Sequence, residues 1–181
     1  MIDAHIHIKT TGNYFPQGNT WFINTTDSGQ WGILIRLAGA NPGIVPFFGI
    51  HPWFIQTRKD EDIRLLEEII SRNQSFHVGE IGLDRIRAKR DPVQYNFGKQ
   101  IEVFKTQLAL AVKYGRAVTI HCVRAWDTLF PVLEEISHNR RFPFKGILHY
   151  FSASREIMNR LLLETDLEAD REAFSVLEAH Y

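Results

Sequence analysis

The chain has 181 residues, of which 44% are apolar, so it is long enough for one substantial core and gives no reason to expect a second domain. Lysine plus arginine and aspartate plus glutamate balance at 21 each, which excludes a positive field over the whole surface. The single cysteine excludes an intrachain disulfide framework, and no apolar run reaches the roughly 18 residues of a membrane span. We therefore expect one domain over residues 1–181, located in the cytoplasm, with no membrane partner and no obligate protein partner.

Seven short apolar runs predict β-strands. They alternate with longer amphipathic stretches, which is typical of a parallel α/β sheet or barrel and not of a β-sandwich. The predicted strands are Ile2–Ile8, Trp21–Thr25, Val45–His51, Phe76–Asp84, Ala117–Cys122, Gly146–Phe151 and Leu161–Asp166.

Three of the stretches between these strands have helical periodicity. Asp60–Ser71 carries apolar residues at helical spacing, with Asp60 as the expected N-cap. Val93–Tyr114 carries the longest apolar stripe; Pro92 can open this helix and Gly115 can end it. A further helix is expected from Ala125 to about His138, and Pro131 should kink or divide it.

Two joints are too short for the crossover of a dozen or more residues that parallel neighbours need. Lys9–Thr20 contains glycine, asparagine and proline where a first helix is expected, and Ser154–Arg160 runs straight into the predicted strand Leu161–Asp166. Either a strand-helix unit before Leu161 is missing from the fold, or residues have been omitted from the sequence.

Residue types that bind metals recur at the ends of the predicted strands. His5 and His7 lie one residue apart in the first strand, so both side chains should project from the same face. Four further residues of metal-binding types occur in later predicted strands: Glu80, His121, His149 and Asp166. Imidazole and carboxylate together suit zinc, manganese or iron, and a shared carboxylate suits two ions. The carboxyl ends of parallel strands are where barrel enzymes place their catalytic groups.

Six segments in order resemble the successive signatures of one known family. They are Asp3-Ala4-His5-Ile6-His7, Gly49-Ile50-His51-Pro52, Gly79-Glu80-Ile81-Gly82-Leu83-Asp84, Ile120-His121-Cys122-Val123-Arg124-Ala125, His149-Tyr150-Phe151-Ser152 and Glu164-Thr165-Asp166. This pattern is similar to that of the TatD-type metal-dependent deoxyribonucleases. The resemblance implies a single-domain, TIM-like (β/α) barrel of the amidohydrolase superfamily that hydrolyses phosphodiester bonds.

The resemblance also implies roles for particular residues. His5 and His7 would hold one divalent ion, Glu80 would bridge to a second, and His121 and His149 would complete the ligands of the second ion. Asp166 would bind metal and orient or deprotonate the attacking water, which makes Asp166 and Glu80 the expected catalytic residues. His51 and Arg124 would contact substrate phosphate. The cofactors would be two ions of zinc, magnesium or manganese, and the substrate would be DNA ends or single strands.

Some of these residues have plainer interpretations. His51 could be a rim residue, His121 and His149 could be hydrogen-bonded core histidines, and Arg124 could pair with Asp127 or Glu134 on the surface. Outside the metal set, three further residues carry expectations: Asp3 as a partner for a ligand imidazole, Asp84 as a support for the metal site or a turn residue, and Cys122 as a packing residue.

The chain also departs from the family pattern. A family member normally has another strand-helix unit before the Glu164-Thr165-Asp166 segment, and residues Leu167 to Asp170 lack the proline and aromatic residues that usually follow. Two other functions therefore stay open. One is an amidohydrolase-type enzyme that cleaves a C–N or carboxyl ester bond, and the other is a non-catalytic metal-binding scaffold.

Overall fold

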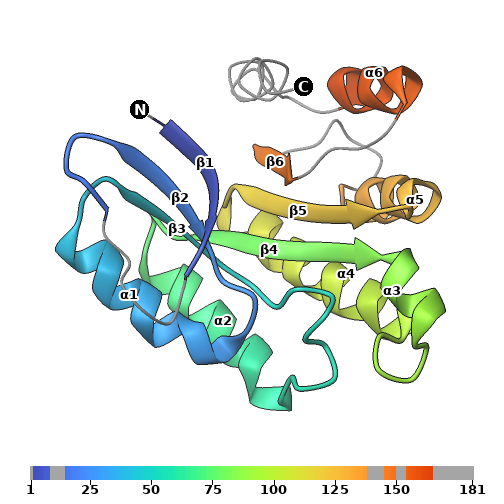
Figure 1. Ribbon diagram of the computed structural model, residues 1–181, viewed down its shortest axis with the longest axis horizontal. Coiled ribbons are helices and arrows are strands. Elements are labelled where there is room, and N and C mark those ends of the chain that lie inside the picture. Colours follow the sequence, from blue (N-terminus) through green and yellow to red (C-terminus); the bar gives the residue numbers. More distant parts are fainter. Residues whose placement is uncertain (1, 9–14, 138–144, 150–153, 165–181) are drawn as a thin grey trace.

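The computed structural model describes residues 2–8, 15–137, 145–149 and 154–164. Its centre is a sheet of six parallel strands, paired in the order in which they occur along the chain. The sheet curls into a half-barrel, and helices cover its outer side (Figure 1). This architecture confirms the predicted TIM-like α/β fold. The strands are β1 (Ile2–His7), β2 (Thr20–Asn24), β3 (Ile44–Phe48), β4 (His77–Asp84), β5 (Val118–Val123) and β6 (Gly146–His149).

Six of the seven predicted strands are present, and the seventh prediction is wrong. Helix α6 spans Arg155–Glu164 and includes the first four residues of the predicted strand; Asp166 lies outside the described residues. Leucine, methionine, glutamate and arginine dominate this segment, and all four are strong helix formers. The Ser154 hydroxyl accepts a 3.5 Å hydrogen bond from the Ile157 N–H at the helix start. The chain after β6 thus forms a helix, as expected of a parallel crossover, and the tight joint predicted before Leu161 does not exist.

The three predicted helices are present, with corrected boundaries. Helix α2 (Asp60–Arg72) begins one residue after Lys59, whose N–H donates to Asp62, so Asp60 is not the N-cap. Helix α4 (Phe97–Tyr114) begins at Phe97 and not at Val93, because the Asn96 side chain caps it by accepting from the Lys99 N–H. Helix α5 (Trp126–Ile136) contains Pro131 without being divided.

Besides α6, the described residues contain two α-helices that the sequence did not predict: α1 (Trp31–Ala40), which a short 3₁₀ turn precedes, and α3 (Arg85–Arg90). Within the described ranges, no helix combines the length and the apolarity that crossing a membrane requires.

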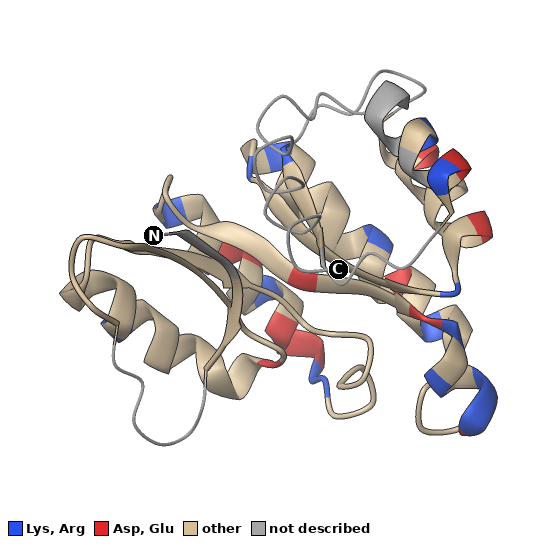
Figure 2. Ribbon diagram, turned by 45° about the horizontal axis from the view of Figure 1, so that its top comes forward, with Lys and Arg blue, Asp and Glu red and all other residues tan. Residues whose placement is uncertain are grey.

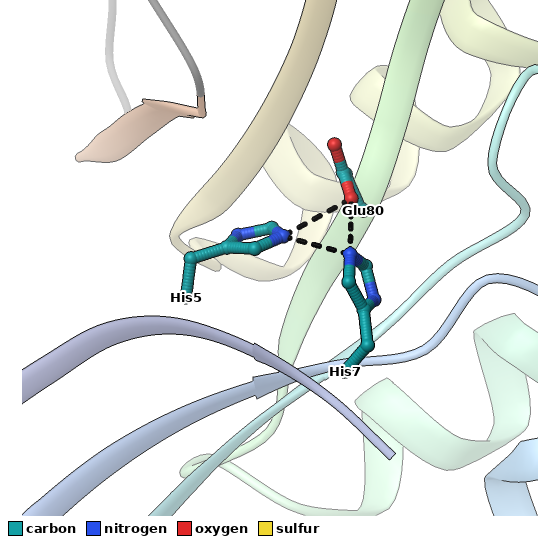
Figure 3. A group of neighbouring side chains, drawn as sticks. All are labelled: His5, His7 and Glu80. Carbon is teal, nitrogen blue, oxygen red and sulfur yellow. Dashed lines mark hydrogen bonds and ion pairs between the residues drawn. The ribbon is translucent and has the colours of Figure 1, made fainter. Parts of the chain in front are cut away.

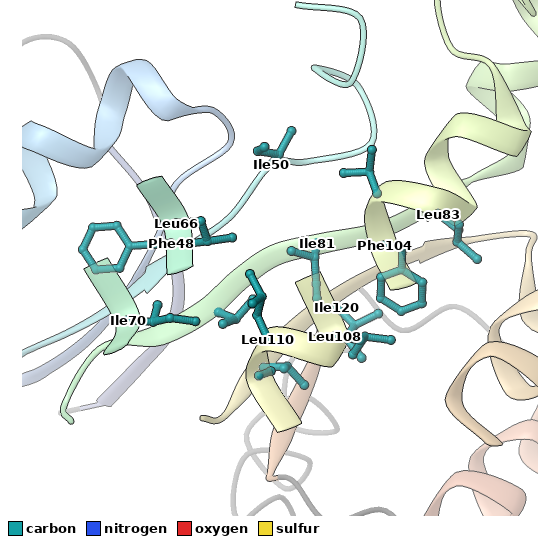
Figure 4. Close-up of a cluster of buried hydrophobic side chains, with 14 of the residues drawn as sticks. Phe48, Ile50, Leu66, Ile70, Ile81, Leu83, Phe104, Leu108, Leu110 and Ile120 are labelled. Carbon is teal, nitrogen blue, oxygen red and sulfur yellow. The ribbon is translucent and has the colours of Figure 1, made fainter. Parts of the chain in front are cut away.

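The main core lies between the outer face of the sheet and the helices that cover it (Figure 4). Phe48, Ile81 and Ile120 from three strands meet Leu66 of α2 and Phe104 of α4, and all five are at most 5% exposed. Burying a side chain of this size contributes about 1.5–3 kcal/mol. This packing fixes the carboxyl ends of β3, β4 and β5 relative to one another.

Helix α4 also holds two strand ends through buried amides. The Gln107 side chain accepts from the Ile50 N–H at 2.8 Å and donates to the Ile50 carbonyl at 3.2 Å. Two helical turns earlier, Gln100 bonds both backbone groups of Asp84 in the same way, at 2.7 and 3.2 Å. Both amides are at most 1% exposed. Gln107 satisfies the backbone of Ile50 just after β3, and Gln100 satisfies that of Asp84 at the last residue of β4, which positions the residues next to them.

Candidate metal centre

Two irregularities in the sheet shape the site. Between Asp3 and Ile6, β1 has one more residue than its partner β2, and between Val78 and Ile81, β4 has one more residue than β5. A bulge of this kind re-aims the side chains beside it. Glu80 lies within the second bulge, and its carboxylate is 1% exposed.

The first group of candidate metal ligands consists of His5, His7 and Glu80. The Nε2 atoms of the two histidines lie 3.0 Å apart, and each lies 3.2 Å from Glu80 Oε2 (Figure 3). His5 is 9% exposed at its side chain, whereas His7 is 42% exposed. The predicted pairing of the two β1 histidines with Glu80 is therefore present in the structure, and the group opens to solvent on the His7 side.

The second group shares the same carboxylate. His121 Nδ1 lies 3.1 Å from Glu80 Oε1, and His51 Nε2 lies 3.7 Å from that oxygen. The two imidazole rings are 4.4 Å apart. Glu80 thus offers one oxygen to each of two groups of imidazoles, which is the arrangement that a bridging carboxylate requires. We call these five residues, His5, His7, His51, Glu80 and His121, the Glu80 cluster.

The protonation of the Glu80 cluster follows from its burial and contacts. Burial alone would raise the pKa of Glu80, but hydrogen bonds from His121 and from the two β1 histidines outweigh it and hold that pKa well below its usual range. Burial lowers the pKa of His121, yet hydrogen bonds to Asp84 and Glu80 prevail and raise it to about 9. Burial lowers the pKa of His51 to about 3. At neutral pH Glu80 is therefore ionised and His51 is neutral.

The tautomer of His51 is set by its own loop. The Trp53 N–H donates to His51 Nδ1 at 3.2 Å, so the neutral ring carries its proton on Nε2, the atom that faces Glu80. A protonated Nε2 is a hydrogen-bond donor and offers no lone pair to a metal. This favours the predicted role of His51 as a substrate contact over a role as a ligand.

Asp84 serves both of the purposes that the sequence left open. Its Oδ1 caps α3 by accepting from the Arg87 N–H at 2.8 Å. Its Oδ2 accepts from Trp53 Nε1 at 2.7 Å and lies 3.4 Å from His121 Nε2. The carboxylate therefore ends β4 and also orients the ring of His121.

Asn24 supports the first group, and the sequence did not single it out. This buried residue at the end of β2 contacts His5 Nδ1 through its amide nitrogen at 3.1 Å, and its amide oxygen accepts from the Thr119 hydroxyl. A 180° rotation of the Asn24 side-chain amide exchanges its oxygen and nitrogen. Asn24 can therefore also accept a hydrogen bond from Nδ1–H of His5 when Nε2 of that ring binds a metal. The available signal was an asparagine at the end of the strand that follows the one with His5 and His7.

The first group fits a metal ion. Ligand atoms 2.0–2.1 Å from a tetrahedral zinc ion are separated by about 3.3 Å. The three separations among His5, His7 and Glu80 are 3.0, 3.2 and 3.2 Å, so the ligand atoms already form one face of such a site. Two imidazoles and one carboxylate also match the donor types that zinc and manganese accept.

Replacing Asn24 with alanine should weaken metal binding by about 10–100-fold, because loss of a group that orients a ligand imidazole typically costs that much. Calorimetric titration of the metal-free protein with zinc measures the effect. Asn73→Ala, which removes an amide bonded to the Ile69 carbonyl at the end of α2, is the control and should bind zinc as the unmodified chain does. Equal zinc affinity of the two variants would contradict the role of Asn24.

The remaining predicted site residues differ in how far the structure describes them. His149 ends β6 with its backbone opposite His121, but its side chain is outside the described part of the chain. Asp166 and the side chain of Asp3 also lie outside the described residues. Their roles as ligands or as orienting groups stay predictions.

Arg124 is exposed directly after β5 and has a φ of 51°, the left-handed region. The two carboxylates proposed as its surface partners bind other arginines: Asp127 lies 2.8 Å from Arg85, and Glu134 lies 2.8 Å from Arg160. Cys122 is buried, and burial raises the pKa of its thiol to about 12, which agrees with the predicted packing role.

Comparison with known proteins identifies the family. The model of the TatD-related DNase family matches residues 2–169, which is most of the chain. The chain belongs to the TatD-related DNase family. A metal-dependent hydrolase of unassigned function from Haemophilus influenzae is 32% identical over 117 residues, which cover 63% of this chain and 42% of the relative. The TatD protein of Edwardsiella piscicida, named a 3'-5' ssDNA/RNA exonuclease, is 30% identical over 140 residues, which cover 77% of this chain and 50% of the relative.

A solved structure extends the TatD likeness to the fold. The TatD homologue YjjV from Escherichia coli superimposes with a TM-score of 0.69 at 24% identity, over 80% of this chain and 53% of that protein. The chain therefore spans about half the length of the TatD relatives that it matches.

Proposed function

We propose that this chain is a metal-dependent hydrolase that cleaves phosphodiester bonds in single-stranded nucleic acid. The observation that carries the proposal is the position of Glu80. Its two carboxylate oxygens lie 3.1–3.7 Å from nitrogens of four histidines, which come from β1, β5 and the loop after β3. The name of the Edwardsiella relative supports nucleic acid as the substrate class.

In this proposal the chain holds two divalent ions. His5, His7 and Glu80 would bind the first, and Glu80 would share the second with His121 and His149. Zinc, magnesium or manganese would fill these positions. When bound, such a pair activates water and stabilises charge on the phosphoryl group. Asp166 is proposed to bind metal and to orient the attacking water.

The other residues would position the substrate. The Trp53 N–H holds the proton of His51 on Nε2, so His51 presents a donor to a phosphate oxygen. Arg124 is exposed at the same strand ends and can pair with two phosphate oxygens through its planar guanidinium.

The test combines metal content with hydrolysis. The purified protein should contain divalent metal by elemental analysis and should hydrolyse bis-p-nitrophenyl phosphate and a labelled single-stranded oligonucleotide. Chelator should abolish both reactions, and magnesium, manganese or zinc should restore them. Exchange of His7 for asparagine should remove activity. The same exchange at His77, the first residue of β4, should retain activity. The His77 ring accepts a hydrogen bond from the Ala117 N–H and is not one of the four imidazoles around Glu80.

Two outcomes would overturn the proposal. Metal-loaded protein that hydrolyses a carboxyl ester or a cyclic amide but no phosphodiester would make the chain an amidohydrolase of another kind. Metal-loaded protein that hydrolyses none of these substrates would make it a binding scaffold.

Exchange of Arg124 for glycine should separate function from stability. A non-glycine residue with a left-handed backbone conformation carries about 1–2 kcal/mol of strain, which glycine removes. Glycine in turn costs about 0.5–1 kcal/mol in the conformational entropy of the unfolded chain. The urea midpoint should therefore stay equal or rise. By contrast, kcat/KM on the oligonucleotide should fall about tenfold, because the variant cannot form a bidentate phosphate bond worth about 1.5–3 kcal/mol at most. A variant that is less stable and fully active would show that Arg124 has only a structural role.

A further inference from the structure

Positive charge is concentrated next to the Glu80 cluster, although the whole chain carries no net charge. Helix α3 has the sequence Arg-Ile-Arg-Ala-Lys-Arg, with four cations and no acid in six residues. Figure 2 shows these cations gathered at one end of the sheet. We call Arg85, Arg87, Lys89 and Arg90 the α3 basic cluster.

The α3 basic cluster is joined to the Glu80 cluster by direct contacts. Asp84 caps α3 through its Oδ1, and its Oδ2 faces His121. The Arg87 guanidinium lies 4.0 Å from the centre of the Trp53 ring, and that ring lies 5.2 Å from His51. Contacts from Arg87 through the partly exposed ring of Trp53 to the buried His51 thus link α3 to the candidate metal centre.

Structural contacts account for only part of the α3 basic cluster. Arg85 bonds Asp127 and the Thr128 hydroxyl, and Arg87 stacks on Trp53 and lies 5.7 Å from the Tyr95 ring. Lys89 and Arg90 are exposed. The acids near the helix are Asp84, which is buried and bonded to Trp53, Asp127, which is paired with Arg85, and the exposed Asp91. The surface therefore keeps an excess of positive charge.

We infer that the α3 basic cluster, together with Trp53 and Tyr95, is a binding surface for single-stranded nucleic acid that guides the strand to the metal centre. This inference rests on the proposed function. Lysine and arginine neutralise backbone phosphates without regard to sequence, and aromatic rings stack on unpaired bases. The combination of cations with aromatic rings, next to a site that cleaves phosphodiesters, fits a single strand better than an acidic protein.

The test compares two double variants with the same change in charge. Lys89→Glu/Arg90→Glu alters the α3 basic cluster, and Arg36→Glu/Arg64→Glu alters exposed residues of α1 and α2. Binding of a labelled 12-mer of thymidine is measured by fluorescence anisotropy in chelator, so that cleavage does not intervene. The α3 variant should bind at least about tenfold more weakly at low salt, and the dependence of log Kd on log salt should fall by about 0.7 for each phosphate that is no longer neutralised. The neutral variant Lys89→Gln/Arg90→Gln should lie between.

Hydrolysis then separates this inference from the proposed function. With metal, the loss of kcat/KM in the α3 variant should be at least tenfold larger for the oligonucleotide than for bis-p-nitrophenyl phosphate. If both double variants bind the 12-mer equally and with equal salt dependence, the inferred surface is wrong even where phosphodiester hydrolysis is intact. If the unmodified chain hydrolyses no phosphodiester, the proposed function fails, and the anisotropy measurement still decides whether the surface binds single strands.

Discussion

Exchange of Glu80 for glutamine is expected to reduce metal-dependent hydrolysis at least about 1,000-fold. Glutamine keeps the shape of the side chain but removes the charge that both groups of histidines share. A metal ion contributes several kcal/mol of charge stabilisation to a phosphoryl transfer, and each 1.4 kcal/mol or so is tenfold in rate. Initial rates on bis-p-nitrophenyl phosphate with zinc or manganese in excess measure the loss.

Loss of metal binding should accompany the loss of rate in Glu80→Gln. A metal that binds only the folded chain stabilises it by about 2.7 kcal/mol at 100 times its Kd, so the unmodified protein should melt at a higher temperature with metal than in chelator. Glu80→Gln should show no such difference. The control is Glu68→Gln, which removes a carboxylate that pairs with Arg72 on the surface of α2 and should keep both activity and the metal-induced shift. A Glu80→Gln protein that still binds two ions would exclude Glu80 as the bridge.

Local patterns predict six of the strands and four of the candidate ligands that the structure brings together, His5, His7, Glu80 and His121. Apolar runs such as those around Val78 and Val118 identify strands because burial decides strand position. Parallel strands then bring their carboxyl ends to one edge of the sheet, so residues as distant as His5 and His121 converge on Glu80 without any detail of packing.

The direction of Glu80 cannot be predicted in the same way. Strict alternation along β4 would place it on the face of Val78, but the bulge between Val78 and Ile81 adds a residue and changes the face. A bulge depends on the register with both neighbouring strands, which no local pattern records.

The contacts of the residues that orient the ligands are harder to predict, because the sequence offers at most a position such as that of Asn24 at the end of a strand. The contact of Asn24 with His5 depends on the register between β1 and β2, and the contact of the Trp53 N–H with Nδ1 of His51 depends on the geometry of a loop. Helix α6 is mistaken for a strand because a short apolar run such as Leu161–Leu163 fits either state, and length alone does not decide between them. The equal numbers of acidic and basic residues in the whole chain likewise give no indication that four cations lie together on α3.

Exchange of Gln107 for methionine is expected to destabilise the fold by about 2–4 kcal/mol. Methionine matches the length of glutamine and fills the same space, but it leaves the N–H and the carbonyl of Ile50 without partners in the core. A buried polar group that loses its partner costs about 1–3 kcal/mol. Urea unfolding followed by circular dichroism gives the change in the free energy of unfolding. Thr106→Met, on the exposed face of the same helix, should change it by no more than about 0.5 kcal/mol.

The same substitution tests whether α4 positions the site as well as the core. His51 directly follows Ile50, so release of the Ile50 backbone should shift the imidazole relative to Glu80, from which it is separated by 3.7 Å. A displacement of about 1 Å at a reacting centre costs up to about 100-fold in rate. In Gln107→Met, kcat/KM on bis-p-nitrophenyl phosphate should fall about 10–100-fold at temperatures where the variant is fully folded, while zinc affinity at His5, His7 and Glu80 is retained. A fall in zinc affinity equal to the fall in rate would mean that Gln107 supports the sheet as a whole and not the loop that carries His51.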